Sequence, residues 1–276
     1  MTADTGRHWR RIAGSSLGLL LSATSLTAHA QCSERLTALQ AAPVSQQSRW
    51  RELDASGRQL VREAGRLHGA ELSLGLHCAD WDLLARASLL DGTRLYDGQT
   101  STDAPMASST RVRQAQAALQ ANYRLADAWQ WGGRLSHHTI WRDIASAGAA
   151  AGYPERYDWT MLAVGAQWQT LAGSNRFSLA AWLGKPLRSS MQLNLPGRDE
   201  ATLKLGPMHQ AELAATWRTP LAGAWHLEAD VQYHRTAMGQ REDTVIQRSG
   251  APVGLAHQPR TIVVELPVAV RIGYAF

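Results

Sequence analysis

The chain has 276 residues, of which 28 are basic and 23 acidic, and a net charge of +5. The basic residues are spread along the sequence instead of forming a run, which argues against a nucleic-acid partner. After residue 30, no stretch approaches the roughly 20 apolar residues that a transmembrane helix needs. The chain holds 11 tryptophans against 2 phenylalanines, and tryptophan is typical of the membrane–water interface.

The first 30 residues have the features of a secretion signal. Arg7, Arg10 and Arg11 precede an apolar core at residues 12–27, and Ala28-His29-Ala30 matches an A-x-A cleavage site. Gln31 precedes Cys32 where a lipoprotein signal requires Gly or Ala, so we predict cleavage after Ala30, with a lipoprotein as the alternative. The predicted organisation is a signal peptide (1–30), a periplasmic segment (31–47) and a β-barrel (48–276).

Two cysteines, Cys32 and Cys78, remain after export. Because the periplasm is oxidising, we predict a disulfide between them at the periplasmic end of the barrel. Two unpaired thiols are the alternative.

Residues 49–67 contain the most ambiguous segment. They read as a strand, a turn at Ala55-Ser56-Gly57 and a returning strand. Trp50, Leu53, Leu60 and Leu67 also fit helical spacing. The hairpin interpretation supplies the last strand of an even-numbered barrel, and the helical interpretation does not.

From residue 72 onward, apolar and polar residues alternate with the period of two that places them on opposite faces of a strand. The clearest case is residues 225–237, where Trp225, Leu227 and Ala229 oppose His226 and Glu228. Similar stripes occupy residues 72–76, 81–89, 115–123, 129–141, 162–168, 177–183, 205–217 and 262–276. Short and long connections alternate between them, as periplasmic turns and extracellular loops do in outer-membrane barrels. The sequence therefore predicts an all-β, antiparallel up-and-down transmembrane barrel of ten strands, with eight or twelve left open.

The last strand ends in alternating apolar residues, Ile272, Tyr274 and Phe276. This pattern resembles the C-terminal assembly signal of bacterial outer-membrane β-barrels. The resemblance implies an outer-membrane location and contact with the barrel-assembly machinery, with outer-membrane lipid and lipopolysaccharide around the wall.

Charged residues of both signs fall on the predicted lumen face. They are Arg86, Arg134, Glu212, Arg218, Glu228, Asp230, His234, Glu265 and Arg271. In a barrel of about ten strands, long side chains can bridge the interior, so we predict a narrow lumen filled by paired charges. A small diffusion path or a proton-active group of Glu228, Asp230 and His234 is the alternative.

No recognisable catalytic or metal centre emerges, and no cofactor is predicted. His137 and His138 are neighbours on one strand and point to opposite faces, so they cannot share a metal. The length and predicted ten-strand layout resemble the omptin proteases, which carry Asp-x-Asp and Asp-x-His pairs. Here Asp80-Trp81-Asp82 falls at a periplasmic turn, and no Asp-x-His occurs.

These features predict a barrel with a structural or interaction role, whose extracellular loops meet a ligand that the sequence does not specify. The alternative is a hydrolase with its site at the extracellular mouth, either omptin-like or acting on lipid A. Ser136, His137 and His138 lie at a suitable height for the lipid-directed form.

Overall fold

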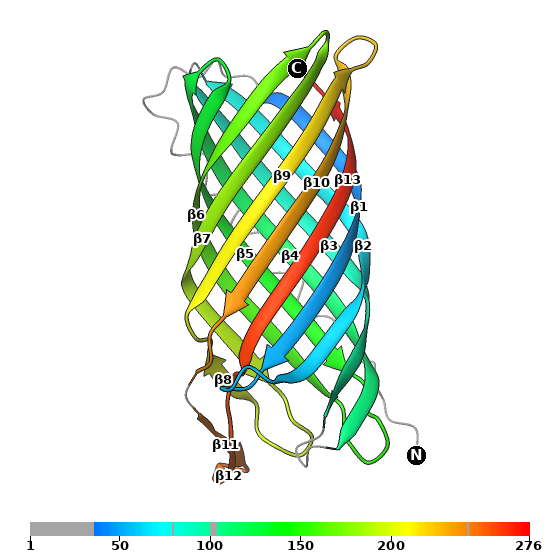
Figure 1. Ribbon diagram of the computed structural model, residues 1–276, viewed down its shortest axis with the longest axis vertical. Helices are drawn as coiled ribbons and strands as arrows, with labels where there is room; N and C mark the ends of the chain where they lie inside the picture. The colour runs from blue at the N-terminus through cyan, green and yellow to red at the C-terminus, as the bar shows by residue number, and fades with distance from the viewer. Residues whose placement is uncertain (1–35, 79, 100–103, 242) are drawn as a thin grey trace.

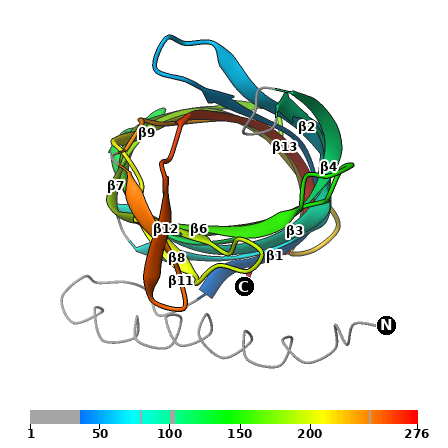
Figure 2. The ribbon, with the colours of Figure 1, turned by 90° about the horizontal axis from the view of Figure 1, so that it is seen from below.

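The computed structural model describes residues 36–78, 80–99, 104–241 and 243–276. Ten long strands of these residues form one closed antiparallel barrel (Figures 1 and 2). They are β1 (Leu36–Leu53), β2 (Gln59–Cys78), β3 (Trp81–Gln99), β4 (Pro105–Ala126), β5 (Trp129–Ile144), β6 (Tyr153–Ala172), β7 (Asn175–Leu193), β9 (Met208–Pro220), β10 (Trp225–Met238) and β13 (Arg260–Tyr274). Pairing of β1 with β13 closes the ring. The ten-stranded expectation is confirmed.

Three short strands lie beyond the wall at one end. Strand β8 (Ala201–Lys204) extends the edge of β7, and β11 (Thr244–Arg248) pairs with β12 (Ala251–Ala256) as a hairpin. We call this end the long-loop end. The other, short-turn end carries the tight turns and the C-terminus (Figure 1). Within the described residues, no helix is long and apolar enough to cross a membrane.

The first strand begins earlier than the sequence predicted. Residues 36–47 belong to β1 and pair with both β13 and β2, so the predicted boundary at residue 48 is wrong for this part. The sequence shows no alternation of apolar and polar residues here, because polar residues occupy both faces of β1. Gln46 and Ser48 point inward, while Ser45 and Gln47 point outward. Residues 50–67 form the β1–β2 hairpin, and the helical alternative is wrong.

The wall changes its polarity along its height. Near the short-turn end, leucines such as Leu72, Leu89 and Leu183 face outward and are 58%, 61% and 68% exposed. Toward the long-loop end, polar residues take many of the outward positions, with Arg66, Thr93 and Arg111 on neighbouring strands. A bilayer needs about 9–11 residues of a tilted strand, whereas β3 has 19 and β4 has 22. The barrel therefore extends well beyond the bilayer at the long-loop end.

The lumen of this extension is packed with apolar side chains. A buried cluster with members on all ten barrel strands fills it, including Trp50, Leu67, Val112, Ile140, Tyr157, Trp159, Met161, Met191, Met208, Met238 and Val263. The extension thus has the polarity of a water-soluble barrel, with apolar side chains inside and polar side chains outside, because water surrounds its wall. The sequence predicted charges in the lumen but not this apolar layer.

One aromatic side chain depends on glycine for its place in the lumen. The Trp182 ring on β7 lies over Gly165 on β6, where an added Cβ would stand 2.4 Å from ring atom Cδ2. The guanidinium of Arg134 lies 4.9 Å from the centre of the same ring. Gly165 therefore leaves the space in which the ring packs, and the ring in turn supports a lumen charge.

Candidate functional site

Nearest the short-turn end, Arg271 of β13 organises the first buried charge network. Its side chain is 1% exposed and donates to Glu71 at 2.9 Å, Glu228 at 3.0 Å and Asp230 at 3.1 Å. These acids come from β2 and β10, the two strands on either side of the β1–β13 pair. One guanidinium thus satisfies three carboxylates from separate parts of the wall, which is what an enclosed polar interior requires.

Midway along the lumen, Arg134 of β5 forms a two-pronged ion pair with Glu212 of β9. His234 Nε2 lies 3.5 Å from the same carboxylate and 2.8 Å from Gln232 Oε1. Gln232 in turn donates to Asp230 at 2.5 Å. Two networks are therefore joined through one amide, and their side chains cross the barrel from β5 to β9.

Toward the long-loop end, Arg142 of β5 is surrounded by three glutamates. Its side chain is 1% exposed, pairs with Glu155, and lies 2.7 Å from Glu63 and 3.5 Å from Glu52. The guanidinium also stacks over the Trp50 ring at 4.2 Å. Arg94 approaches Glu63 at 3.6 Å from the other side. Two arginines thus share three buried acids next to an aromatic face.

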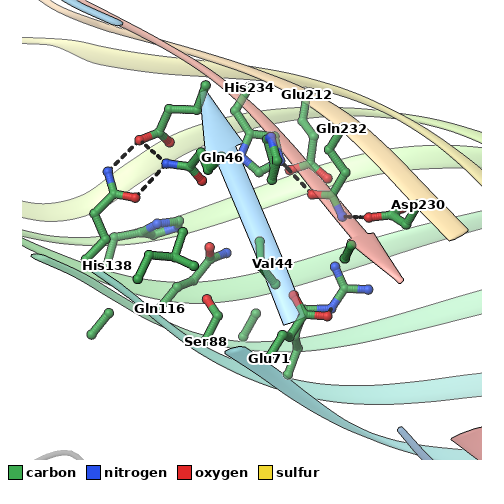
Figure 3. A pocket seen from close by; sticks show the side chains of 18 of the residues that line it. Val44, Gln46, Glu71, Ser88, Gln116, His138, Glu212, Asp230, Gln232 and His234 are labelled. Carbon is green, nitrogen blue, oxygen red and sulfur yellow. Dashed lines mark hydrogen bonds and ion pairs between the residues drawn. The ribbon is translucent and has the colours of Figure 1, made fainter. Parts of the chain in front are cut away.

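A lumen cavity lies between the first two networks, and its volume is about 60 Å³. Figure 3 shows Glu71, His138, Glu212, Asp230 and His234 around it. A space of this size holds only a few water molecules. The described side chains therefore leave only a small pocket at this level of the lumen.

The structure places all nine of the predicted lumen charges on the inner wall. Arg86 lies 3.4 Å from Glu71, and Arg218 lies 3.2 Å from His226. Glu265 accepts hydrogen bonds from Gln46 at 3.0 Å and Gln114 at 2.5 Å. Glu228 and Asp230 contact Arg271 and His234 contacts Glu212, so the three residues of the proton-active alternative do not form one direct cluster.

Sequence reasoning missed most of the network around Arg142. Glu52 and Glu63 fell in the ambiguous segment 49–67, Arg94 lay beyond the stripe at residues 81–89, and Glu155 lay between the stripes at residues 129–141 and 162–168. The available signal was the inward parity of Arg142, which directly follows the stripe at residues 129–141. Its partners become visible only once β2 and β6 are known to extend beyond the bilayer.

His137 and His138 point to opposite faces, as expected. His138 faces the lumen, where its Nε2 lies 2.9 Å from Ser136 Oγ and its ring stacks on Trp159. His137 is on the outer wall, with Nδ1 3.1 Å from Thr160 Oγ1 and Nε2 4.0 Å from Asp158 Oδ1.

Other hydroxyl and charged groups complete this outer cluster. Thr139 donates to Asp158 at 2.8 Å, and Arg156 Nε lies 2.8 Å from the other oxygen of that carboxylate. A carboxylate, an imidazole and two hydroxyls therefore converge on the outer face of β5 and β6, just beyond the outward leucines Leu135 and Leu162.

The Asp80-Trp81-Asp82 sequence lies at the short-turn end. Asp82 Oδ1 contacts His77 Nδ1 at 2.6 Å, and Oδ2 accepts from Gln130 at 2.7 Å. Cys78 ends β2 at the same end of the barrel and is 2% exposed. Cys32 lies outside the described residues, so the disulfide stays a prediction. Within the described part of the chain, no three His, Cys, Asp or Glu side chains are grouped as metal ligands.

The C-terminal aromatic residues lie on the outer wall at this end. Tyr274 makes edge contacts with Trp225 at 5.1 Å and Phe276 at 5.0 Å between ring centres. Trp81 and Tyr123 form a similar pair on β3 and β4. Such rings form the interfacial girdle of a membrane barrel.

At the long-loop end, the β11–β12 hairpin projects from the wall and presents apolar side chains. Val245 pairs with Leu255, and Val245, Val253 and Leu255 are 49%, 44% and 65% exposed. Asp199 fixes the tip of the hairpin by accepting from the backbone N–H groups of Ser249 at 3.1 Å and Gly250 at 2.8 Å.

The fold is similar to that of the outer-membrane protease OmpT from Escherichia coli. The two chains are 8% identical, the TM-score is 0.59, and the match covers 89% of this chain and 98% of the protease. Another similar structure is the β domain of the Bordetella autotransporter BrkA, at 11% identity, a TM-score of 0.46, and coverage of 88% and 100%. No protein-family model and no curated protein sequence match the chain. At these identities, the likeness extends to the fold alone.

Proposed function

We propose that this bacterial outer-membrane β-barrel is a non-conducting protein with a structural or interaction role. The short-turn end faces the periplasm, and the long-loop end faces outward. The observation that supports the proposal best is the filling of the lumen: three ion networks and an apolar layer occupy it, and the cavity between the first two networks has a volume of only about 60 Å³. The projecting β11–β12 hairpin gives the protein an apolar surface outside the cell.

Uptake of small solutes by proteoliposomes tests this proposal. We expect liposomes with the wild-type barrel to take up potassium ions and small sugars no faster than empty liposomes, with a general porin as the positive control. Rapid uptake of either solute by the wild-type barrel would reject a closed lumen.

A second candidate function is hydrolysis of an acyl ester in the outer leaflet. The outer cluster of His137, Thr160 and Asp158 supports it, since an imidazole between a hydroxyl and a carboxylate is the arrangement that activates a nucleophile. Its height, just beyond the outward leucines, is where ester groups of lipid lie. The omptin-like form has no comparable support, because Asp82 lies at the periplasmic end.

Release of fatty acid from phospholipid or lipid A in mixed micelles tests this second candidate. We expect His137→Ala to abolish release if the cluster is catalytic. His68→Ala, which removes another exposed outward histidine, should retain activity. No release by the wild type above the level of His137→Ala would eliminate the hydrolase.

A further inference from the structure

A concave groove lies on the outer wall where β13, β1 and β2 meet toward the extracellular end. It is lined by Arg49, Arg51, Gln59, Arg62, Ile262 and Val264 and has a volume of about 260 Å³. The tip of the β1–β2 hairpin projects outward from the ring (Figure 2). Ile262 faces this groove and is only 6% exposed on the outer side of the wall, so the neighbouring side chains already enclose part of it.

Some outward arginines of the barrel have a carboxylate partner. Arg111 and Arg113 both contact Asp91, and Arg156 contacts Asp158. No ion pair with a carboxylate is formed by Arg49, Arg51 or Arg62 within the described residues. Asp97 is the cross-strand neighbour of Arg62, but no ion pair joins them.

Two of the groove arginines face each other directly. Arg51 of β1 pairs with Arg62 of β2 in the ladder register, and Arg49 is on the same face two residues away. Like charges at directly opposed positions destabilise a sheet. An anion between the guanidinium groups removes this repulsion and accepts several charge-assisted hydrogen bonds.

The surroundings of the groove indicate the source of the anion. Val264 continues downward into the outward stripe of Leu266, Val268, Val270 and Ile272, whose side chains are 37–54% exposed. This stripe lies at the level of the bilayer. In a ligand with a negatively charged head above acyl chains, the head lies beside the arginines and the chains lie beside the apolar stripe.

We infer that this groove binds the phosphorylated sugar head of an outer-leaflet glycolipid, with a phosphate held by Arg49, Arg51 and Arg62. The acyl chains of the lipid pack along the outward stripe of β13. The inference requires the outer-membrane location of the barrel and is independent of whether the lumen conducts.

Titration of the folded barrel with lipid A in detergent, followed by native mass spectrometry, tests the inference. The groove variant carries Arg49→Gln, Arg51→Gln and Arg62→Gln. The matched control carries Arg111→Gln, Arg113→Gln and Arg248→Gln, which removes the same number of charges from exposed positions outside the groove. We expect the wild type and the control to bind lipid A equally, and the groove variant to bind at least tenfold more weakly.

Chemically altered ligands separate the possible sources of affinity. Dephosphorylated lipid A should bind the wild type as weakly as lipid A binds the groove variant. Inorganic phosphate should not compete at equal concentration. Equal loss in the control variant, equal binding of dephosphorylated lipid A, or full competition by inorganic phosphate would each overturn the inference.

A stability measurement keeps the test decisive if the triple variant does not fold. Arg51→Gln alone removes the opposed like charges. We expect it to raise the unfolding temperature in lipid-free detergent and to reduce the stabilisation gained from added lipid A. A lower unfolding temperature together with an unchanged gain from lipid A would contradict the assigned site.

Discussion

At the scale of single residues, the barrel is defined by long buried side chains that satisfy several partners each. Arg142 forms ion pairs with three glutamates and stacks on a tryptophan ring, and Arg271 forms ion pairs with three carboxylates. Removing such a cation leaves its acids buried without a counter-charge, which costs more than the ion pair itself contributes.

Arg142→Met should therefore lower the free energy of unfolding by about 3–5 kcal/mol, because Glu52, Glu63 and Glu155 lose their shared partner. Arg111→Met is the matched control: its side chain is 61% exposed and pairs with an exposed aspartate, so its loss should cost less than about 1 kcal/mol. Reversible unfolding in urea with lipid vesicles measures both. Equal effects of the two substitutions would mean that Arg142 is not a buried centre.

Gly165→Ala should destabilise the barrel by about 1–3 kcal/mol, since the new methyl group overlaps the Trp182 ring and a backbone oxygen at 2.5 Å. Gly133→Ala provides the comparison on the neighbouring strand, where the nearest atom lies 4.0 Å from the added Cβ. It should be neutral or slightly stabilising. The same urea titrations decide the matter, and a tolerated Gly165→Ala would show that Trp182 packs elsewhere.

At the scale of elements, the strands that cross the bilayer could be read from the sequence, and their extensions could not. On β10, Leu227, Ala229 and Val231 face lipid while Glu228 and Asp230 face the lumen. The alternation of apolar and polar residues is therefore clear in the sequence. Beyond the bilayer, both faces mix polar and apolar residues. The outward Leu95 and the inward Glu63 carry no readable signal, because water replaces lipid outside and the core moves inside.

The assignment of Ala229 on β10 to the lipid-facing side of the wall can be tested by substitution. Ala229→Arg should cost about 2–4 kcal/mol, the penalty for a cation at the bilayer midplane. Ala107→Arg, also outward and exposed but on the extracellular part of β4 opposite Asp97, should cost little or stabilise the barrel slightly. Unfolding in lipid vesicles compares the two. A greater cost at position 107 would mean that the bilayer covers the other end of the wall.

At the scale of the whole molecule, the networks depend on which strands face one another across the lumen. Glu63 and Arg142 are 79 residues apart, and Gln46 and Glu265 are 219 apart. The sequence gives the inward parity of each residue, which is why all nine predicted charges lie on the inner wall. The tilt and stagger of the ladder set their heights, and those follow only from closure of the ring.

The role of the C-terminal aromatic residue in assembly of the barrel can be tested by deletion. Deleting Phe276 should sharply reduce the inserted barrel while leaving export and signal cleavage intact, because the exposed Phe276–Tyr274 pair ends the strand that the assembly machinery is expected to recognise. Phe276→Trp keeps an aromatic terminus and should insert normally. Heat-modifiable mobility of outer-membrane fractions reports the folded fraction. Normal insertion of the truncated chain would remove the proposed role of the terminus.

The change of polarity along the wall underlies the closed lumen and the outer groove alike, and two leucines on β3 test it. Leu83 and Leu95 both face outward and are separated by twelve residues, about 28 Å of height for a strand tilted by about 45°. The most direct measurement is the accessibility of a spin label at each position to oxygen and to a water-soluble nickel chelate in bilayers. We predict a lipid-like profile at position 83 and a water-like profile at position 95, and lipid-like profiles at both would contradict the account.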